Sequence, residues 1–174
     1  MSRPRFDLAA IAELLRRSEN DPLVRNFFGQ AMSRIERDEY YGSLEFKPEG
    51  VDVVFHEAPW VVPSEEMTDP KELYVAGFHL HREGHEGYAG YSGQLPNGVA
   101  LGDAEDEVLR KMGPSVHSRG GGMSKLLKGP IPYWFRYAFG NGFLHFQLDA
   151  SGRIEMVTLD ARGRTGLSVS GPTG

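Results

Sequence analysis

The strongest constraint on the fold of this sequence is a run of three β-prone segments joined by very short turns. Residues 133–139, 143–148 and 153–159 are rich in aromatic and aliphatic side chains, and the turns between them are Gly140-Asn141-Gly142 and Asp149-Ala150-Ser151-Gly152. Connections this short join antiparallel neighbours, because parallel strands need a crossover of a dozen or more residues. The segments therefore predict an antiparallel three-strand meander.

A second group of β-prone segments lies in the first half of the chain. Residues 40–46 and 51–56 flank Lys47-Pro48-Glu49-Gly50, which has the composition of a turn and predicts a hairpin. Residues 58–70 are rich in proline and acidic residues and predict a long loop. Residues 73–82 alternate between apolar and polar side chains. This alternation predicts a strand whose one face carries Tyr74, Ala76, Phe78 and Leu80.

Helical patterns precede both groups of strands. Asp7 and Asp21 stand where they can cap helices, and Pro22 suits a first helical position. A third helix is expected to be capped by Asp103 and to end at Gly113-Pro114, where a left-handed residue precedes a helix breaker. The apolar faces of the three helices are predicted to comprise Leu8, Ile11, Leu14 and Leu15, then Leu23, Val24, Phe27 and Phe28, then Val108, Leu109 and Met112.

The remaining segments are predicted to be connections. Residues 33–39 are polar, and residues 84–102 are rich in glycine and tyrosine and bridge the two groups of strands. Residues 115–130 read as a mobile loop. Residues 161–174 are rich in glycine, serine and threonine, and we expect them to form a flexible tail.

The order of these elements predicts an α+β fold in which N-terminal helices pack on an antiparallel sheet. Residues 1–160 are expected to form a single domain of two successive halves, about 1–87 and 88–160, each a helical segment followed by antiparallel strands. Only the order of elements is shared between the halves. An internal duplication and two unrelated halves therefore both stay open.

The amino-acid composition limits the cellular compartments in which the protein is expected. The chain contains no cysteine, which excludes disulfides, thiolate catalysis and cysteine-ligated zinc. No apolar run is long enough to span a membrane, and the first twenty residues lack the apolar core of a signal peptide. We therefore expect a cytoplasmic protein that does not act in a membrane.

Charge is distributed unevenly along the chain. Residues 38–109 contain sixteen acidic and three basic side chains, whereas the net charge of the whole chain is −5. So acidic a segment repels phosphate backbones and attracts basic proteins, although a solvated face that maintains solubility explains it equally well. Nucleic acid is not an expected partner.

Three histidines are the best candidates for metal ligands. His79 and His81 are two apart on a predicted strand and so share a face, and His85 follows in the next turn. Glu83 or Glu86 could complete a coordination shell. No recognisable ligand motif follows them, and histidines at a solvated strand edge would produce the same pattern. The sequence therefore predicts no metal and no other cofactor.

The sequence contains little evidence for the motifs of known catalytic sites. Residues 118–125 are rich in glycine but lack the spacing of a phosphate-binding loop. No serine lies in a nucleophile elbow, and the paired acids Glu65-Glu66 and Glu105-Asp106-Glu107 are typical of solvated surfaces. We expect a protein that is not an enzyme.

The acid-rich segment also contains aromatic residues, a combination typical of protein interfaces. Aromatic rings supply buried area in an interface, and the surrounding charges steer association. Trp60, in a proline-flanked loop, is the best single candidate, whereas Tyr74 is expected to lie in the core. The predicted partner-binding residues are Glu57, Trp60, Glu65, Glu66, Asp69, Glu72, Glu83, Glu86, Tyr88 and Tyr91.

One stretch resembles a known group of proteins. Residues 88–99, YAGYSGQLPNGV, are followed by Leu101-Gly102-Asp103, Glu107-Val108 and Met112-Gly113-Pro114. This order of residues is similar to the Leu-Pro-x-Gly…Gly-Asp/Thr…Val…Leu-Gly-x-Pro pattern of small bacterial immunity-type proteins. The helix-then-sheet order also resembles the tandem units of the β-lactamase-inhibitor-protein and outer-membrane-assembly lipoprotein superfamily.

The resemblance implies a non-catalytic inhibitor that binds a cognate protein toxin, a basic one in view of the acidic segment. Exported members of the superfamily carry a signal peptide and a lipidation cysteine, which this sequence lacks, so a cytoplasmic antidote is the role that fits. Two alternatives stay open. One is a small metal-dependent hydrolase using His79, His81 and His85, and the other is a structural or assembly module that homodimerises through strand edges. A monomer and a homodimer are both compatible with the sequence.

Overall fold

The computed structural model describes residues 5–67, 69, 71–124 and 128–161. In this part of the chain it contains three α-helices and one eight-stranded sheet. The helices are α1 (Leu8–Leu14), α2 (Pro22–Phe28) and α3 (Glu105–Met112). The strands are β1 (Glu36–Arg37), β2 (Tyr41–Phe46), β3 (Val51–Glu57), β4 (Leu73–His81), β5 (Ser118–Ser124), β6 (Gly129–Phe139), β7 (Gly142–Leu148) and β8 (Ile154–Asp160).

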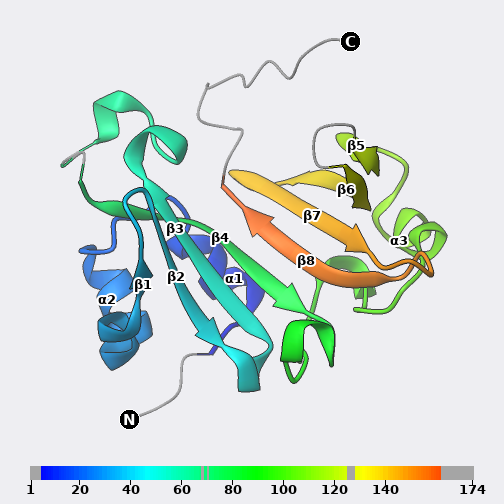
Figure 1. The fold of residues 1–174 in the computed structure, drawn as a ribbon, viewed down its shortest axis with the longest axis horizontal. Coiled ribbons are helices and arrows are strands. Elements are labelled where there is room, and N and C mark those ends of the chain that lie inside the picture. Colours follow the sequence, from blue (N-terminus) through cyan, green and yellow to red (C-terminus); the bar gives the residue numbers. More distant parts are fainter. Residues whose placement is uncertain (1–4, 68, 70, 125–127, 162–174) are drawn as a thin grey trace.

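The sheet is antiparallel throughout, with the strand order β1-β2-β3-β4-β8-β7-β6-β5 (Figure 1). The first four strands and the last four strands are each consecutive in the sheet, and they meet where β4 pairs with β8. The predicted hairpin and the predicted meander are both confirmed. The expectation of an α+β fold with helices packed on an antiparallel sheet is confirmed as well.

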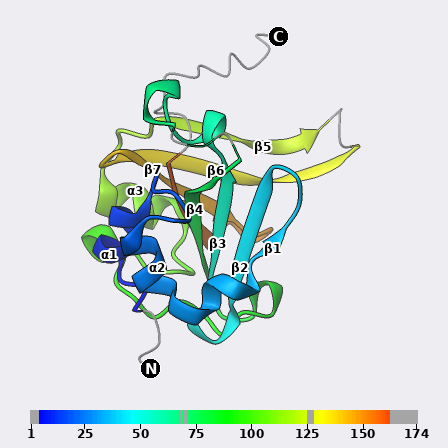
Figure 2. The same ribbon diagram turned by 90° about the vertical axis from the view of Figure 1, so that its left-hand side faces the viewer.

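All three helices contribute to one hydrophobic core on the same face of the sheet (Figure 2). Ile11, Val24 and Val108 are fully buried there, together with side chains from β2, β3, β4, β6, β7 and β8. The pairing of β4 with β8 makes the sheet continuous rather than split into two packed sheets, and one core runs beneath both groups of strands. The opposite face, called here the open face, has a smaller apolar cluster at one end, where residues 58–62 fold over Val54, Tyr74 and Ala76.

An extra residue in β4 changes which side chains share a face. Val54 pairs with Gly77 and Phe55 pairs with Val75, so Ala76 is a bulge that has no partner residue on β3. The predicted common face of Tyr74, Ala76, Phe78 and Leu80 is therefore wrong. Tyr74 and Ala76 lie in the open-face cluster, whereas Phe78 and Leu80 lie in the main core.

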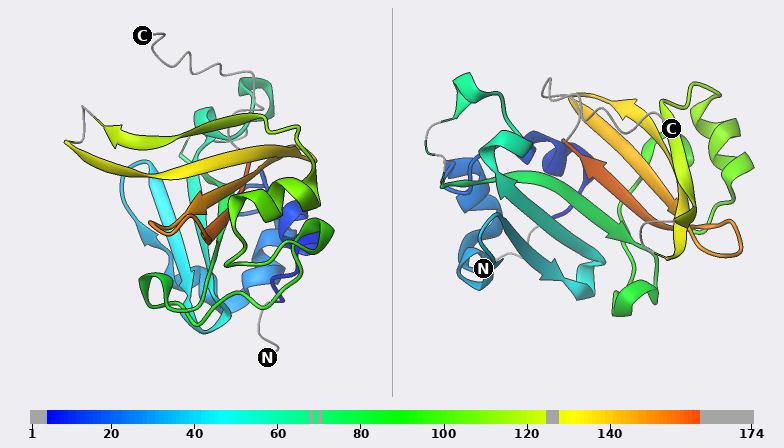
Figure 3. Two further views of the ribbon diagram at one scale, coloured as in Figure 1. Left: turned by 90° about the vertical axis from the view of Figure 1, so that its right-hand side faces the viewer. Right: turned by 45° about the horizontal axis from the view of Figure 1, so that its top comes forward.

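The segment 115–130 contains a strand rather than a mobile loop, so that prediction is wrong. β5 pairs with β6, and Gly120 lies opposite Trp134. A Cβ atom at Gly120 would lie 2.4 Å from the Trp134 ring, and one at Gly121 would lie 2.4 Å from the carbonyl oxygen of Pro132. Glycine lowers strand propensity but lets β6 approach this closely. Residues 129–131 pair with β5, and β6 pairs with β7 only from Trp134 onward, so the β5–β6 hairpin projects beyond β7 (Figure 3).

Two of the three predicted helix caps are confirmed. The Asp7 carboxylate accepts a hydrogen bond from Ala10 N at 3.0 Å, and Asp21 accepts one from Leu23 N at 2.8 Å. The third is wrong, because α3 begins after Ala104 and the Asp103 carboxylate instead accepts hydrogen bonds from Ala100 N and Lys111 Nζ. Leu23 is also 46% exposed, so it is not part of the buried face of α2.

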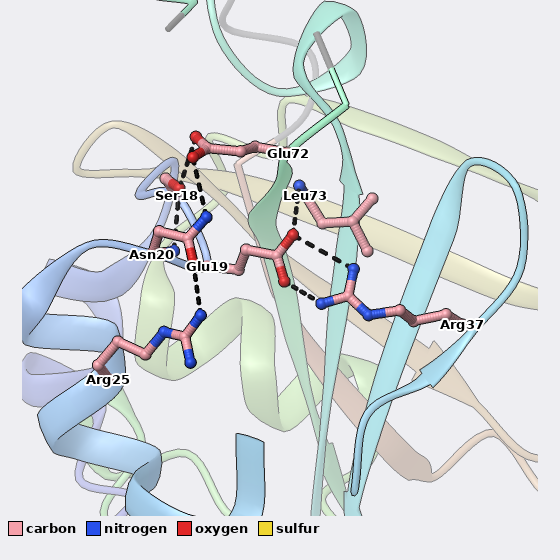
Figure 4. Close-up of polar contacts among 7 residues, drawn as sticks. All are labelled: Ser18, Glu19, Asn20, Arg25, Arg37, Glu72 and Leu73. Carbon is pink, nitrogen blue, oxygen red and sulfur yellow. Dashed lines mark hydrogen bonds and ion pairs between the residues drawn. The ribbon is translucent and has the colours of Figure 1, made fainter. Parts of the chain in front are cut away.

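Residues 33–39 are more than a polar connection, because they include β1 and the end of a 3-10 helix (Gly29–Arg34). Arg37 of β1 forms an ion pair with the buried carboxylate of Glu19, which also accepts a hydrogen bond from Leu73 N at 3.0 Å (Figure 4). This carboxylate therefore joins the α1–α2 connection to β1 and to the start of β4. Of the predicted tail, Ala161 is buried and donates to Ala76 O, and residues 162–174 lie outside the described part.

Candidate functional site

The predicted partner-binding residues fall into two groups at opposite ends of β4. Nine strand residues at about 3.3 Å each separate the groups by roughly 30 Å. The group beyond the end of β3 and the start of β4 contains Glu57, Trp60, Glu65, Glu66, Asp69 and Glu72. The group after the end of β4 contains Glu83, Glu86, Tyr88 and Tyr91. One compact partner-binding surface does not include both groups.

The first group contains one exposed aromatic residue, Trp60, and is hydrogen-bonded to a second, Tyr40. Trp60 and Tyr40 are each 52% exposed. The indole Nε1 of Trp60 donates to Glu57 Oε1 at 3.1 Å, and Glu57 N donates to the carbonyl oxygen of Tyr40 at 3.2 Å. These three residues are called here the Trp60 patch. Glu65, Glu66 and Asp69 are exposed in the segment that follows it.

Negative charge around the Trp60 patch affects the tyrosine. The pKa of Tyr40 is raised by a hydrogen bond with Glu39, by partial burial and by the negative charge of Glu57, in decreasing order of size. Tyr40 was not among the predicted site residues, because it precedes β2 and reads as part of the strand. Its position between the acidic residues Asp38-Glu39 and the strand was the available signal.

Glu72 has a structural role that separates it from the exposed acids. Its two carboxylate oxygens accept hydrogen bonds from Ser18 Oγ and Asn20 Nδ2, each at 2.9 Å (Figure 4). These bonds tie the start of β4 to the connection between α1 and α2. Neutralising Glu72 would therefore disturb the fold as well as the surface charge.

Neither tyrosine of the second group presents its ring to solvent as a free aromatic anchor. Tyr88 is 4% exposed and stacks on His81 with ring centroids 3.8 Å apart and planes 4° apart. Tyr91 is half-buried and its hydroxyl donates to Phe6 O at 2.7 Å. Burial raises the pKa of Tyr88 and, with a smaller contribution from Asp7, raises the pKa of Tyr91 to about 12.

The second group lies beside a cluster of histidines and acids on the open face. Asp52 of β3 accepts hydrogen bonds from His79 Nδ1 at 2.8 Å and from His81 Nε2 at 2.5 Å. Burial alone would raise the pKa of Asp52, but these two bonds outweigh it and lower the pKa to about 2. The prediction that His79 and His81 share a face is confirmed, and Asp52 is the residue that they share.

His85 extends this cluster toward β8. It opens a short 3-10 turn (His85–Gly87) after β4, and its Nδ1 lies 2.8 Å from Nδ1 of His81. Its Nε2 lies 3.8 Å from a carboxylate oxygen of Glu155, which also accepts a hydrogen bond from Gln147. We call Asp52, His79, His81, His85 and Glu155 the histidine cluster. The sequence did not predict the two acids, because they reach the histidines from other strands.

A groove borders the second half of the open face. It has a volume of about 1140 Å³ and lies between the β5–β6 hairpin and the turn that joins β7 to β8. Trp134 lines it and stacks on His145 of β7 with ring centroids 4.8 Å apart. Residues 118–124 form the edge strand beside this groove, so they do not lead into a helix as a phosphate-binding loop would.

Comparisons with known proteins identified no relative of this chain. No protein-family model, curated protein or solved structure matches this chain. The resemblance to immunity-type proteins therefore rests on residues 88–114 alone. Within the described ranges, no helix combines the length and the apolar composition that crossing a membrane requires.

Proposed function

We propose that this protein is a cytoplasmic immunity protein that binds a basic protein toxin and inhibits it without catalysis. The observation that carries the proposal is the Trp60 patch, in which a half-exposed indole donates a hydrogen bond to Glu57, and the amide of Glu57 donates to the carbonyl oxygen of a second exposed aromatic residue, Tyr40. The resemblance of residues 88–114 to immunity-type proteins supports the same role.

The physical chemistry of the patch fits a protein partner. A tryptophan that is already oriented by a hydrogen bond loses little side-chain freedom on binding, and tryptophan is strongly enriched among the residues that dominate interface energies. The exposed acids Glu65, Glu66 and Asp69 extend the negative charge next to it. Such a rim accelerates association with a basic partner and repels acidic ones.

The test uses the product of the open reading frame immediately upstream, produced in cells with and without this chain. The proposal predicts that the upstream product arrests growth and that this chain restores it. Trp60→Ala should lose the rescue and weaken binding by about 2 kcal/mol or more. Tyr133→Ala is the matched control, since Tyr133 is 64% exposed on the distant β5–β6 hairpin and should rescue fully. An upstream product that is harmless, or that Trp60→Ala still neutralises, contradicts the proposal.

Charge can be tested separately from the aromatic anchor. The triple change Glu65→Gln, Glu66→Gln and Asp69→Asn should slow association with the upstream product and flatten its dependence on salt. Glu72 stays unchanged because it supports the fold. Stopped-flow association rates at low and high salt measure the effect. Equal rates for the variant and the original chain would show that the acids do not steer the partner.

We also propose that the two halves arose by duplication of one helix-then-strand unit. Two α-helices in the first half and one, α3, in the second precede four strands that are consecutive in the sheet, and the last strands, β4 and β8, pair antiparallel. The strand order therefore reads the same from either edge of the sheet. Superposing β2–β3–β4 on β6–β7–β8 tests the idea, since a true repeat should also bring a helix of the first half onto α3.

A further inference from the structure

The close contact between His81 and His85 indicates a property of the protein that is separate from inhibitor binding. Their Nδ1 atoms are 2.8 Å apart, and the ring centroids are 5.1 Å apart with planes 25° apart. These values place the rings edge to edge, with the two nitrogens directed at each other. Two imidazole nitrogens in this arrangement share a single proton, because one must donate and the other must accept.

Each of the two rings has a carboxylate at its other nitrogen. Nε2 of His81 donates to Asp52 at 2.5 Å, and Nε2 of His85 faces Glu155 at 3.8 Å. This is the arrangement typical of metal-binding histidines, in which an outer carboxylate fixes the tautomer and makes the inner nitrogen a better ligand. His81 is further held in place by its stacking on Tyr88, and its side chain is only 1% exposed.

A third ligand lies in the same turn. A carboxylate oxygen of Glu86 and one ring nitrogen each of His81 and His85 lie within 4.8 Å of one another. We propose that these three residues bind a divalent transition-metal ion of the zinc type through the two Nδ1 atoms and the Glu86 carboxylate. The metal replaces the shared proton, which leaves to solvent. The proposal is independent of the toxin partner.

The ligand types and the geometry select this class of ion. Two imidazoles and one carboxylate suit zinc and its neighbours, whereas magnesium and calcium prefer oxygen ligands. Two nitrogens bound tetrahedrally to zinc at 2.0–2.1 Å stand roughly 3.3 Å apart. The His81–His85 contact therefore has to lengthen by about half an ångström, and the His85 ring has to turn so that both lone pairs point at the ion rather than at each other. Glu86 and His85 are in the turn after β4, which is the side that can move.

The other grouping in the cluster is less suited to a metal. Asp52, His79 and His81 also place potential ligand atoms within 4.8 Å of one another. There, however, an ionised carboxylate already accepts a proton from each histidine at 2.8 and 2.5 Å. A metal would have to displace two charge-assisted hydrogen bonds, which are about twice as strong as neutral ones. Asp52 thus acts as the outer carboxylate rather than as a ligand.

The experiment titrates the full chain with Zn²⁺ by calorimetry and repeats the titration with Co²⁺, whose visible spectrum reports coordination. The original chain should bind one ion, with Mg²⁺ giving no heat. His85→Ala and Glu86→Ala should each abolish or severely weaken binding, and both side chains are outside the core, so the fold is kept. Glu155→Gln removes the charge of the outer carboxylate of His85 and leaves an amide oxygen that can still accept from Gln147, and it should weaken zinc binding by about 10–100-fold.

Two further variants make the assignment decisive. His117→Ala is the matched control, since His117 is an exposed histidine near the start of β5 and should leave zinc binding unchanged. His79→Ala should also bind normally. Loss of binding in His79→Ala with retention in His85→Ala would place the ion at Asp52 instead and overturn the proposal. Absence of Zn²⁺ binding by the original chain would overturn it as well.

Discussion

At the residue scale, the ionisation of Asp52 contributes to stability. It is largely buried on the open face, yet hydrogen bonds from His79 and His81 keep its pKa at about 2. An aspartate in an unfolded chain has a pKa of about 3.9. The folded state therefore favours the charged form, so the contribution of Asp52 is fully present above the unfolded pKa and is lost as pH falls through 2.

We predict that Asp52→Asn lowers the free energy of unfolding by roughly 2–3 kcal/mol at neutral pH, because the shift of the pKa corresponds to that much interaction. The difference between the variant and the original chain should shrink as pH falls from about 4 to about 2. Urea denaturation across this pH range measures it. Glu83→Gln, at an exposed position, is the control and should change stability little at any pH. A difference that stays constant with pH would mean that the charge of Asp52 is not the cause.

The ion pair between Glu19 and Arg37 is a second side-chain contact that we expect to contribute to the free energy of unfolding (Figure 4). Arg37→Ala would leave the buried Glu19 carboxylate with only the Leu73 amide as a hydrogen-bond donor among the contacts described above. We expect a loss of about 1–3 kcal/mol in unfolding free energy, the cost of leaving a buried charged group poorly satisfied. Arg34→Ala, on the preceding turn, is the control for loss of a nearby positive charge. A double change with Glu19→Leu that costs less than the sum of the single changes would confirm the coupling.

At the element scale, β5 depends on the absence of side chains at its glycines. Gly120→Ala would place a Cβ atom 2.4 Å from the Trp134 ring. We predict a loss of about 1–3 kcal/mol and weaker pairing of β5 with β6, because the overpacked ring has to move. Amide hydrogen exchange in β5 and β6 reports the pairing. Gly152→Ala is the control for a glycine-to-alanine change without steric overlap, since nothing lies within 4 Å of its missing Cβ, and it should leave exchange in β5 unchanged.

The same comparison shows which elements a sequence can predict. β6, β7 and β8 were predictable because their turns are short and chemically distinct. β5 was not, since its sequence, SRGGGMS, contains almost no strand-forming residues and its pairing depends on Trp134, which is distant in the sequence. The bulge at Ala76 could not be predicted either, because the alternation of side chains along β4 does not show where an extra residue is inserted.

The candidate site was predictable to a similar degree. His79 and His81 share a face because residues two apart on a strand do so where no bulge lies between them, and the bulge at Ala76 precedes both. Asp52 and Glu155 became their partners only through the pairing of β4 with β3 and β8. The acidic residues were recognised as a group along the chain, but the length of β4 separates them in space. Site residues that are close in the sequence were thus predicted, whereas those brought together by strand pairing were not.

At the scale of the whole molecule, one core beneath both halves predicts a single cooperative unfolding transition. The chain has two tryptophans, Trp60 in the first half and Trp134 in the second. Variants with only one of them, made by Trp60→Phe or Trp134→Phe, should report the same denaturation midpoint as circular dichroism. Residues 1–87 or 88–161 produced alone should not fold stably, since each would lose the pairing of β4 with β8. Separate midpoints for the two tryptophans would show that the halves are independent domains.

The pairing of β4 with β8 has a consequence for synthesis on the ribosome. β4 ends at His81, but its partner begins at Ile154, so the nascent chain presents β4 as an unpaired edge until nearly all of the described chain has emerged. Contacts between such distant segments slow folding, and an exposed edge invites pairing with other chains. We therefore expect the sheet to be completed only late in translation, when β8 pairs with β4. A chaperone that shields the edge of β4 should raise the yield of soluble protein.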